Sequence, residues 1–138
     1  MRVALVYVPA GDSDALARVS KAMARALEAA GHFVDIFEAR ADESPRLTGH
    51  EYVIIGTESA SAMGKIPRRV SQFLAQAGMI SGKRSMAFLR KSGLRPDKAL
   101  SRLMKAMEAE GMMVNCSEIV SDEKGAAEAA RGAPIERN

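Results

Sequence analysis

The sequence predicts one three-layer α/β domain, with a five-stranded parallel β-sheet of order 2-1-3-4-5 and helices on both faces. Two observations support this fold class. Short apolar runs alternate along the chain with longer segments in which apolar residues recur at helical spacing. The runs at 3–8 and 52–55 are almost entirely apolar, as expected for central strands that are buried on both faces. We expect right-handed crossovers and the strands at 3–8 and 52–55 adjacent at the centre, which is the order 2-1-3-4-5.

Length and composition are consistent with this architecture. The 138 residues fit one domain, and the hydrophobic and charged fractions, 47% and 27%, are ordinary for a globular protein. We therefore interpret 1–138 as a single domain and expect 134–138 to fray. No apolar run approaches the roughly 18 residues of a membrane span. The single cysteine, Cys116, excludes an internal disulfide and favours a reducing compartment, so we expect a cytoplasmic protein.

The first part of the chain reads as a β-α-β unit. Residues 3–8 form a strand, and the Pro-Ala-Gly sequence at 9–11 breaks it. Apolar residues recur at helical spacing from 16 to 27, which predicts a helix with one buried face. The run at 33–37 alternates more strongly in polarity and is expected nearer an edge of the sheet. Residues 39–49 hold a proline and mixed charges, as in a short helical turn or an irregular crossover.

The central part contains the most informative stretch. The strand at 52–55 is expected to end at Gly56, and small polar residues follow it. Pro67 suits the first position of a helix, where its missing N–H has no cost. Gly78 suits the position just beyond the end of that helix. A buried strand, a polar loop and a helix start in this order predict the rim of a ligand site.

The last part repeats the same plan. We expect a strand at 86–89, a helix at 96–110 that opens on a Pro-Asp pair, and a strand at 112–120. The Ala- and Glu-rich segment at 122–131 is expected to form a short final helix. With the predicted strand order, the helices at 67–77 and 97–110 lie side by side on one face of the sheet.

Small and polar residues gather in the three loops that follow the first, third and fourth strands. The carboxyl ends of parallel strands meet at one edge of the sheet, so these loops should border a ligand site at the switch point between strands one and three. The candidate ligand-binding residues are Ala10, Gly11, Asp12, Ser13, Thr57, Glu58, Ser59, Ala60, Ser61, Met63, Lys91, Ser92 and Gly93.

Over nearly its whole length the chain resembles the flavodoxin-like family. Gly11 and Ser13 stand where the family's phosphate loop has the glycine and last threonine of Thr-Gly-x-Thr. The Gly-Thr pair at 56–57 and the Gly-Lys-Ile-Pro sequence at 64–67 resemble its second loop, and 91–93 its third. The resemblance implies that flavin mononucleotide (FMN) is the cofactor. It also implies that the chain acts as an electron carrier or an FMN-dependent oxidoreductase.

The residues themselves leave each assignment open. The backbone N–H groups of 11–13 suit a phosphate at a helix start, but they equally suit an ordinary capping turn in which Asp12 repels an anion. The hydroxyls of Thr57, Ser59 and Ser61 either bind a ligand or belong to a solvated loop. No nucleophile-base-acid set can be assembled, so we assign no catalytic residues.

Aromatic residues give a second interpretation of the function. All six aromatic side chains lie in predicted strands or in a helix, and none lies in the three loops where a flavin ring would stack. The alternative is therefore a flavodoxin-fold domain that has lost flavin binding. Such a domain would act as a regulatory or protein-interaction module through a basic face.

Charge supports a protein partner. Residues 65–105 carry eleven basic side chains and one acidic side chain, Asp97. Exposed helix charge is the plain explanation, but we expect this face to meet an acidic redox or regulatory protein. Nucleic-acid binding is disfavoured because no aromatic residues are interleaved with the charges. The basic residues expected on the face are Arg68, Arg69, Lys98, Arg102 and Lys105.

Cysteine and histidine offer little chemistry. Cys116 lies in a predicted strand between apolar residues, so we expect an inert, packed thiol. His32 and His50 each stand beside a glycine at the entry to a strand, and neither has a second ligand at metal-binding spacing. We interpret both as surface histidines and predict no metal site.

Overall fold

The computed structural model describes residues 1–39, 47–78 and 80–136, so most of the predicted crossover at 39–49 lies outside the described residues. Helices and strands alternate along the chain, as the sequence predicts. They are β1 (Arg2–Val8), α1 (Ala15–Ala29), β2 (Phe33–Glu38), β3 (Tyr52–Glu58), α2 (Arg68–Gln76), β4 (Arg84–Arg90), α3 (Pro96–Ala109), β5 (Met113–Val120) and α4 (Glu123–Gly132).

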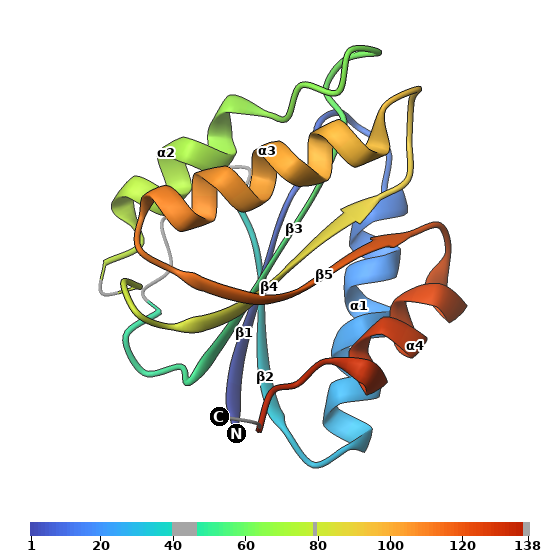
Figure 1. The fold of residues 1–138 in the computed structure, drawn as a ribbon. Coiled ribbons are helices and arrows are strands. Elements are labelled where there is room, and N and C mark those ends of the chain that lie inside the picture. Colours follow the sequence, from blue (N-terminus) through green and yellow to red (C-terminus); the bar gives the residue numbers. More distant parts are fainter. Residues whose placement is uncertain (40–46, 79, 137–138) are drawn as a thin grey trace.

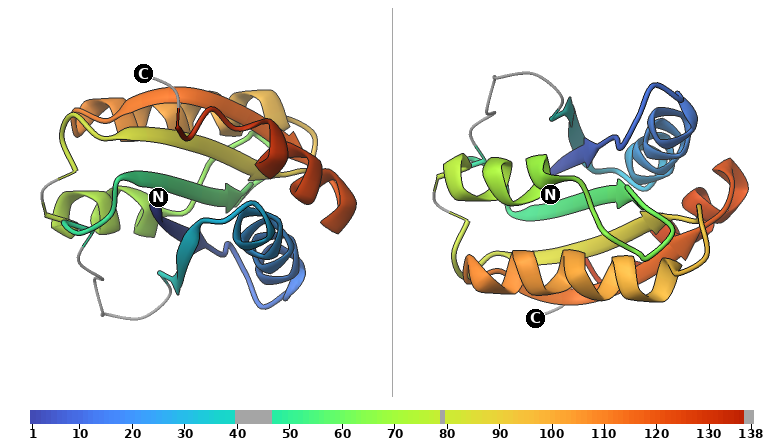
Figure 2. Two further views of the ribbon diagram at one scale, coloured as in Figure 1. Left: turned by 90° about the horizontal axis from the view of Figure 1, so that it is seen from below. Right: turned by 90° about the horizontal axis from the view of Figure 1, so that it is seen from above.

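The sheet confirms the predicted topology. Its five strands are all parallel and lie in the order β2-β1-β3-β4-β5. Figures 1 and 2 show α1 and α4 side by side on one face and α2 and α3 side by side on the other. The fold is therefore a three-layer α/β sandwich, with the carboxyl ends of the strands at one edge.

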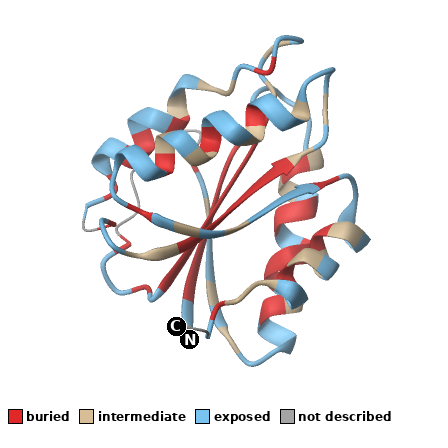
Figure 3. Ribbon diagram, viewed as in Figure 1, coloured by how far each residue is buried: buried red, intermediate tan, exposed pale blue. Residues whose placement is uncertain are grey.

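Burial follows the position of each strand in the sheet. All of β3 is buried, and so is β1 after Arg2, whereas β2 and β5 expose much of their length (Figure 3). Phe33 of β2 is 75% exposed, in agreement with its predicted place on an edge strand. The apolar runs of the central strands therefore reflect burial on two faces.

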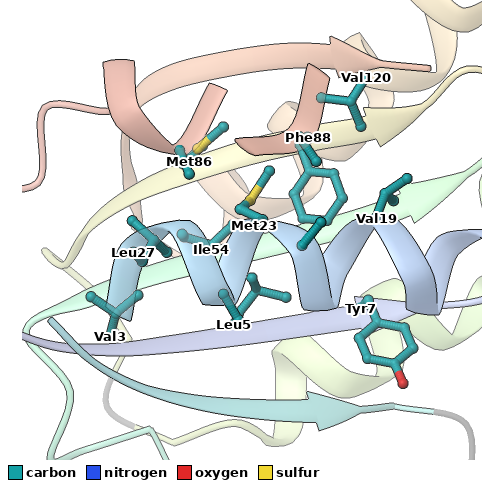
Figure 4. Close-up of a cluster of buried hydrophobic side chains, with 14 of the residues drawn as sticks. Val3, Leu5, Tyr7, Val19, Met23, Leu27, Ile54, Met86, Phe88 and Val120 are labelled. Atoms are coloured by element: carbon teal, nitrogen blue, oxygen red, sulfur yellow. The ribbon is translucent and has the colours of Figure 1, made fainter. Parts of the chain in front are cut away.

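Successive side chains of a strand enter opposite core layers. Val3, Leu5 and Tyr7 of β1 pack with α1 and α4, and Figure 4 shows them with Met23 and Leu27 of α1. The intervening residues of β1 pack with α2 and α3 in the second layer. Ile135 is buried in the first layer, so the expectation that the tail frays from 134 is wrong at this residue.

Strand β3 is longer than predicted, and Gly56 is not its end. Gly56 pairs with Phe88 of β4, and the strand continues to Glu58. A Cβ atom at Gly56 would lie 2.0 Å from the Phe88 ring. The glycine therefore makes room for the aromatic ring in the core, and Thr57 and Glu58 belong to the buried strand.

Helix ends agree with the predictions to within a few residues. Helix α1 begins at Ala15 with Asp14 as N-cap, slightly later than the expected cap at Asp12 or Ser13. Pro67 is the N-cap of α2 and not its first helical residue. Gly78 has φ +82°, which confirms it as the left-handed residue beyond that helix.

Candidate functional site

The loops after β1, β3 and β4 border one cavity of about 290 Å³ at the carboxyl edge of the sheet. This edge is the switch point between β1 and β3, where open α/β sheets place their ligands. Every lining residue except Arg90 is among the candidate ligand-binding residues that the sequence predicts. The lining residues are Ala10, Gly11, Asp12, Ser13, Glu58, Ser59, Ala60, Arg90 and Ser92.

The loop after β1 forms one wall of the cavity. Residues 10–13 are exposed and lead into α1. The Ser13 hydroxyl accepts a hydrogen bond from the Ala15 N–H at 3.2 Å, so it helps to begin the helix. A Cβ atom on Gly11 would meet nothing within 4 Å. The loop therefore has open space beside Gly11, where it lines the cavity.

Glu58 forms the floor, at the last position of β3. The residue is only 3% exposed. The Ala10 N–H donates to its Oε2 atom at 2.9 Å, and Arg90 Nε donates to its Oε1 atom at 2.8 Å. Arg90 Nη2 lies 2.7 Å from the same Oε1. The Glu58–Arg90 ion pair joins the ends of β3 and β4, and the bond from Ala10 adds the loop after β1.

Thr57 does not reach the cavity. It is fully buried, and its hydroxyl donates to the carbonyl of Val8 at 2.7 Å. That bond fixes the end of β1 against β3, next to the site. The structure therefore gives Thr57 a positioning contact in the sheet.

Ser61 organises the loop between β3 and α2. Its Oγ atom accepts from the N–H groups of Met63 and Lys65, both at 3.3 Å. The Ser61 carbonyl accepts from Gly64 at 3.2 Å, and Gly64 has φ +78°, which favours glycine. The loop is thus a tight, internally bonded turn, and Ser61 does not line the cavity.

The second and third loops touch each other. A Cβ atom on Gly64 would lie 3.0 Å from the Arg95 carbonyl, and one on Gly93 would lie 3.7 Å from the Ser61 carbonyl. Arg102 of α3 donates to the Met63 carbonyl at 2.9 Å. These contacts join the two loops, and neither Met63 nor Gly93 lines the cavity.

Two large apolar side chains project from these adjoining loops. Met63 is 63% exposed and Leu94 is 80% exposed. Sequence analysis singled out Met63 but missed Leu94, although a leucine in a polar loop beside a glycine is a usable signal. Arg90 was also missed, although it ends an apolar strand directly before the Lys-Ser-Gly loop.

Two hydroxyls at the cavity have unused hydrogen-bonding capacity. Ser59 Oγ and Ser92 Oγ are shielded from solvent, and neither has a hydrogen-bond partner within the described part of the chain. Buried polar groups are normally bonded, so each of these atoms requires an explanation. Because both residues line the cavity, a ligand with polar groups would supply partners.

A larger cavity, of about 630 Å³, lies away from these loops. It is bordered by the first residues of β5, together with Arg84, Glu108 and Pro134. The buried Tyr52 hydroxyl donates to Asn115 there at 2.7 Å, and burial raises the Tyr52 pKa. Three residues that line this larger cavity have polar side chains, Arg84, Glu108 and Asn115, against six in the smaller cavity. Because the smaller cavity also lies at the switch point of the sheet, we place the candidate site there.

The remaining candidates behave as follows. Cys116 is a half-buried free thiol whose pKa is raised by burial and by Glu118, in agreement with an inert cysteine.

The prediction that His50 is a surface residue is wrong. His50 is buried, and its Nε2 atom lies 2.7 Å from Asp35 Oδ2. Within the described ranges, acidic, histidine and cysteine side chains form no metal-binding group, and no helix is long and apolar enough to cross a membrane.

Similarity to known proteins is visible in structure and not in sequence. No family model and no curated protein matches the chain. Oxidised flavodoxin 1 from Bacillus cereus matches over 95% of this chain and 93% of its own, with a TM-score of 0.72 and 10% identity. A flavodoxin from the domain Archaea matches over 95% and 92%, with a TM-score of 0.69 and 19% identity. The chain has the flavodoxin-like fold.

A third match extends this result. Two-electron reduced Megasphaera elsdenii flavodoxin aligns with 94% of this chain and 99% of its own, with a TM-score of 0.65 and 19% identity. The flavodoxin-like fold therefore accounts for nearly all of the chain. At these identities the likeness establishes the fold and leaves the ligand to be argued from the site.

Proposed function

We propose that the chain binds FMN at this cavity and carries electrons as a flavodoxin-like protein. One observation carries the proposal. Three loops converge on a cavity that holds two shielded, unpartnered hydroxyls, and Met63 and Leu94 stand exposed on the adjoining loops. Similarity to solved flavodoxins supports the same ligand.

The residues present suit each part of FMN. Residues 10–13 line the cavity in the loop that leads into α1, so a phosphate would lie beside this loop. Ser59 and Ser92 would bond the sugar-alcohol chain or the polar edge of the ring. Met63 and Leu94 offer apolar surface to the ring. When bound, the flavin supplies reversible one- and two-electron chemistry, and the protein supplies binding and orientation.

Titration with FMN tests the proposal. Absorbance and fluorescence should report saturable binding of one FMN per chain. Ser59→Ala and Ser92→Ala should each weaken binding about fivefold, the usual net effect of one lost hydrogen bond. Ser101→Ala, at an exposed position of α3, is the matched control and should bind as the unchanged protein does. Saturation with equal affinity in all four proteins would exclude the two hydroxyls as contacts.

The alternative function is a flavodoxin-fold interaction module without flavin. Two observations favour it: the Ala10 N–H is already bonded to Glu58, and no aromatic residue lies in the three loops. Under this alternative the absorbance titration shows no FMN binding at any concentration. Purified protein would also lack the yellow colour of a flavoprotein.

We also propose an acidic redox or regulatory protein as the partner. Arg68, Lys98, Arg102 and Lys105 are exposed on α2 and α3, and none forms an ion pair with another described residue. Arg69 is half-buried, so it adds less to the surface than expected. A cytoplasmic location, expected from the single cysteine, stays a prediction.

A further inference from the structure

Glu58 uses the groups at this edge that are best suited to hold an anion. A backbone N–H in a loop and an arginine guanidinium can both donate hydrogen bonds to phosphate oxygens. Here the Ala10 N–H and two nitrogens of Arg90 are directed at the Glu58 carboxylate, at 2.7 to 2.9 Å. The carboxylate therefore occupies the binding capacity that a phosphate ligand would otherwise meet.

Charge at the cavity adds to this effect. The charged side chains that line it are Asp12, Glu58 and Arg90, so the ordinary ionised forms leave a net charge of −1. A phosphate monoester is close to dianionic at neutral pH. Its entry is opposed by both carboxylates, and the single guanidinium is already paired with Glu58.

We propose that Glu58 is a resident anion that sets the ligand preference of the site by competing with phosphate monoesters for Arg90 and the Ala10 N–H. The consequence for FMN rests on the proposed function: the phosphate of FMN contributes little to its affinity. The ring and the hydroxyl-bearing chain contribute the larger share. Flavin consequently binds more weakly, and exchanges faster, than it would at the same site without the competing Glu58 carboxylate.

Phosphate titration of isotope-labelled protein tests the competition without any flavin. Amide resonances of residues 10–13 should move little in the unchanged protein when inorganic phosphate is added. In Glu58→Gln, Arg90 is released and one negative charge is lost, so the same amides should titrate about tenfold more tightly. Glu58→Asp keeps the charge and is the matched control, with no gain expected.

Flavins give the second readout. The ratio of the riboflavin to the FMN dissociation constant should rise about tenfold in Glu58→Gln, because only FMN carries the phosphate. A purely structural role for the Glu58–Arg90 pair would lower the melting temperature and leave this ratio unchanged. An unchanged ratio together with unchanged phosphate affinity in a folded Glu58→Gln variant would overturn the proposal.

A measurement on the unchanged protein covers the case in which Glu58→Gln does not fold. Phosphate should leave the Ala10 amide resonance in place, because Glu58 keeps that N–H. Movement of the Ala10 amide as large as that of Gly11 would reject the competition. Failure of the two proposals is also distinguishable. If Glu58→Gln binds phosphate more tightly but FMN does not bind, only the proposed function is rejected. If FMN binds but Glu58→Gln binds phosphate no more tightly, only the proposed role of Glu58 is rejected.

Discussion

Gly56 and Phe88 face each other on neighbouring central strands, and the contact depends on the absence of a side chain. The Phe88 ring is fully buried, and a Cβ atom on Gly56 would come within 2.0 Å of it. Gly56→Ala should therefore force the ring or the strands to move. We expect it to lower the free energy of unfolding in urea by about 1–3 kcal/mol, the usual range for overpacking.

A second glycine gives the control for this prediction. A Cβ atom on Gly132, the last residue of α4, would meet nothing within 4 Å. Gly132→Ala should leave stability unchanged or raise it slightly, because alanine is the better helix former. An equal loss of stability in both variants would contradict the steric explanation.

Individual site residues were predictable where local sequence determines them. The loop after β1 could be read from Pro9 and Gly11, which end an apolar run. Glu58 was assigned to a loop because small polar residues follow Gly56. Its actual contacts come from Ala10 and Arg90, which are 48 and 32 residues away in the chain. Such pairing depends on strand register, which a single sequence does not reveal.

At the scale of elements, β2 is tied to the start of β3 through Asp35 and His50. The His50 hydrogen bond is the largest cause of a lowered Asp35 pKa, and Arg2 adds to it, while burial partly opposes them. A carboxyl whose pKa is lowered by folding stabilises the fold above its unfolded pKa. That contribution disappears as the pH falls through the folded value.

Asp35→Asn tests this contribution. The Asp35 side chain is 52% exposed, so solvent screening keeps the effect below about 1 kcal/mol. The variant should be less stable than the unchanged protein at about pH 6. The difference should shrink as the pH falls through the lowered pKa of Asp35, because the carboxyl is then protonated in the folded state as well. Urea unfolding across this range measures it. Glu28→Gln, on the exposed side of α1, should show no such trend.

Element boundaries depended on information of two kinds. Pro96 opens α3 as predicted, because proline restricts its own backbone at a helix start. The end of β3 was misjudged because neighbouring strands extend it: Thr57 pairs with Val8 of β1 and Glu58 with Arg90 of β4. Strand length in a parallel sheet is therefore set partly by its neighbours.

For the whole molecule, the strand order was predicted from the alternation of strands and helices and from the apolar runs at 3–8 and 52–55, which belong at the centre of the sheet. Charge was harder to place, because a count over residues 65–105 treats all basic side chains alike. Arg90 is paired with Glu58, and the Lys83 ammonium donates to the carbonyls of Leu47 and Thr48 at 2.8 and 3.2 Å. Part of the basic excess is therefore internal, and the exposed remainder lies mainly on α2 and α3.

That exposed remainder gives the last prediction, which concerns association with an acidic protein. The apolar tips of Met63 and Leu94 lie on the loops that lead into α2 and α3. An acidic partner that docks on the basic face would thus approach the cavity as well. Opposite charges on two surfaces accelerate encounter at low salt, and added salt screens that attraction.

Charge reversal at Arg68 and Lys105 tests this docking surface, with an acidic [2Fe–2S] ferredoxin as the probe. Arg102 is left unchanged because it holds the Met63 carbonyl. Association measured by stopped flow should slow about tenfold at low ionic strength and lose most of its salt dependence.

Reversal of Lys21 and Arg25, both exposed on α1, changes the net charge equally on the other face and should have little effect. Equal slowing by both pairs would assign the attraction to net charge and not to this face. Tighter binding of duplex DNA than of ferredoxin would identify nucleic acid as the partner instead.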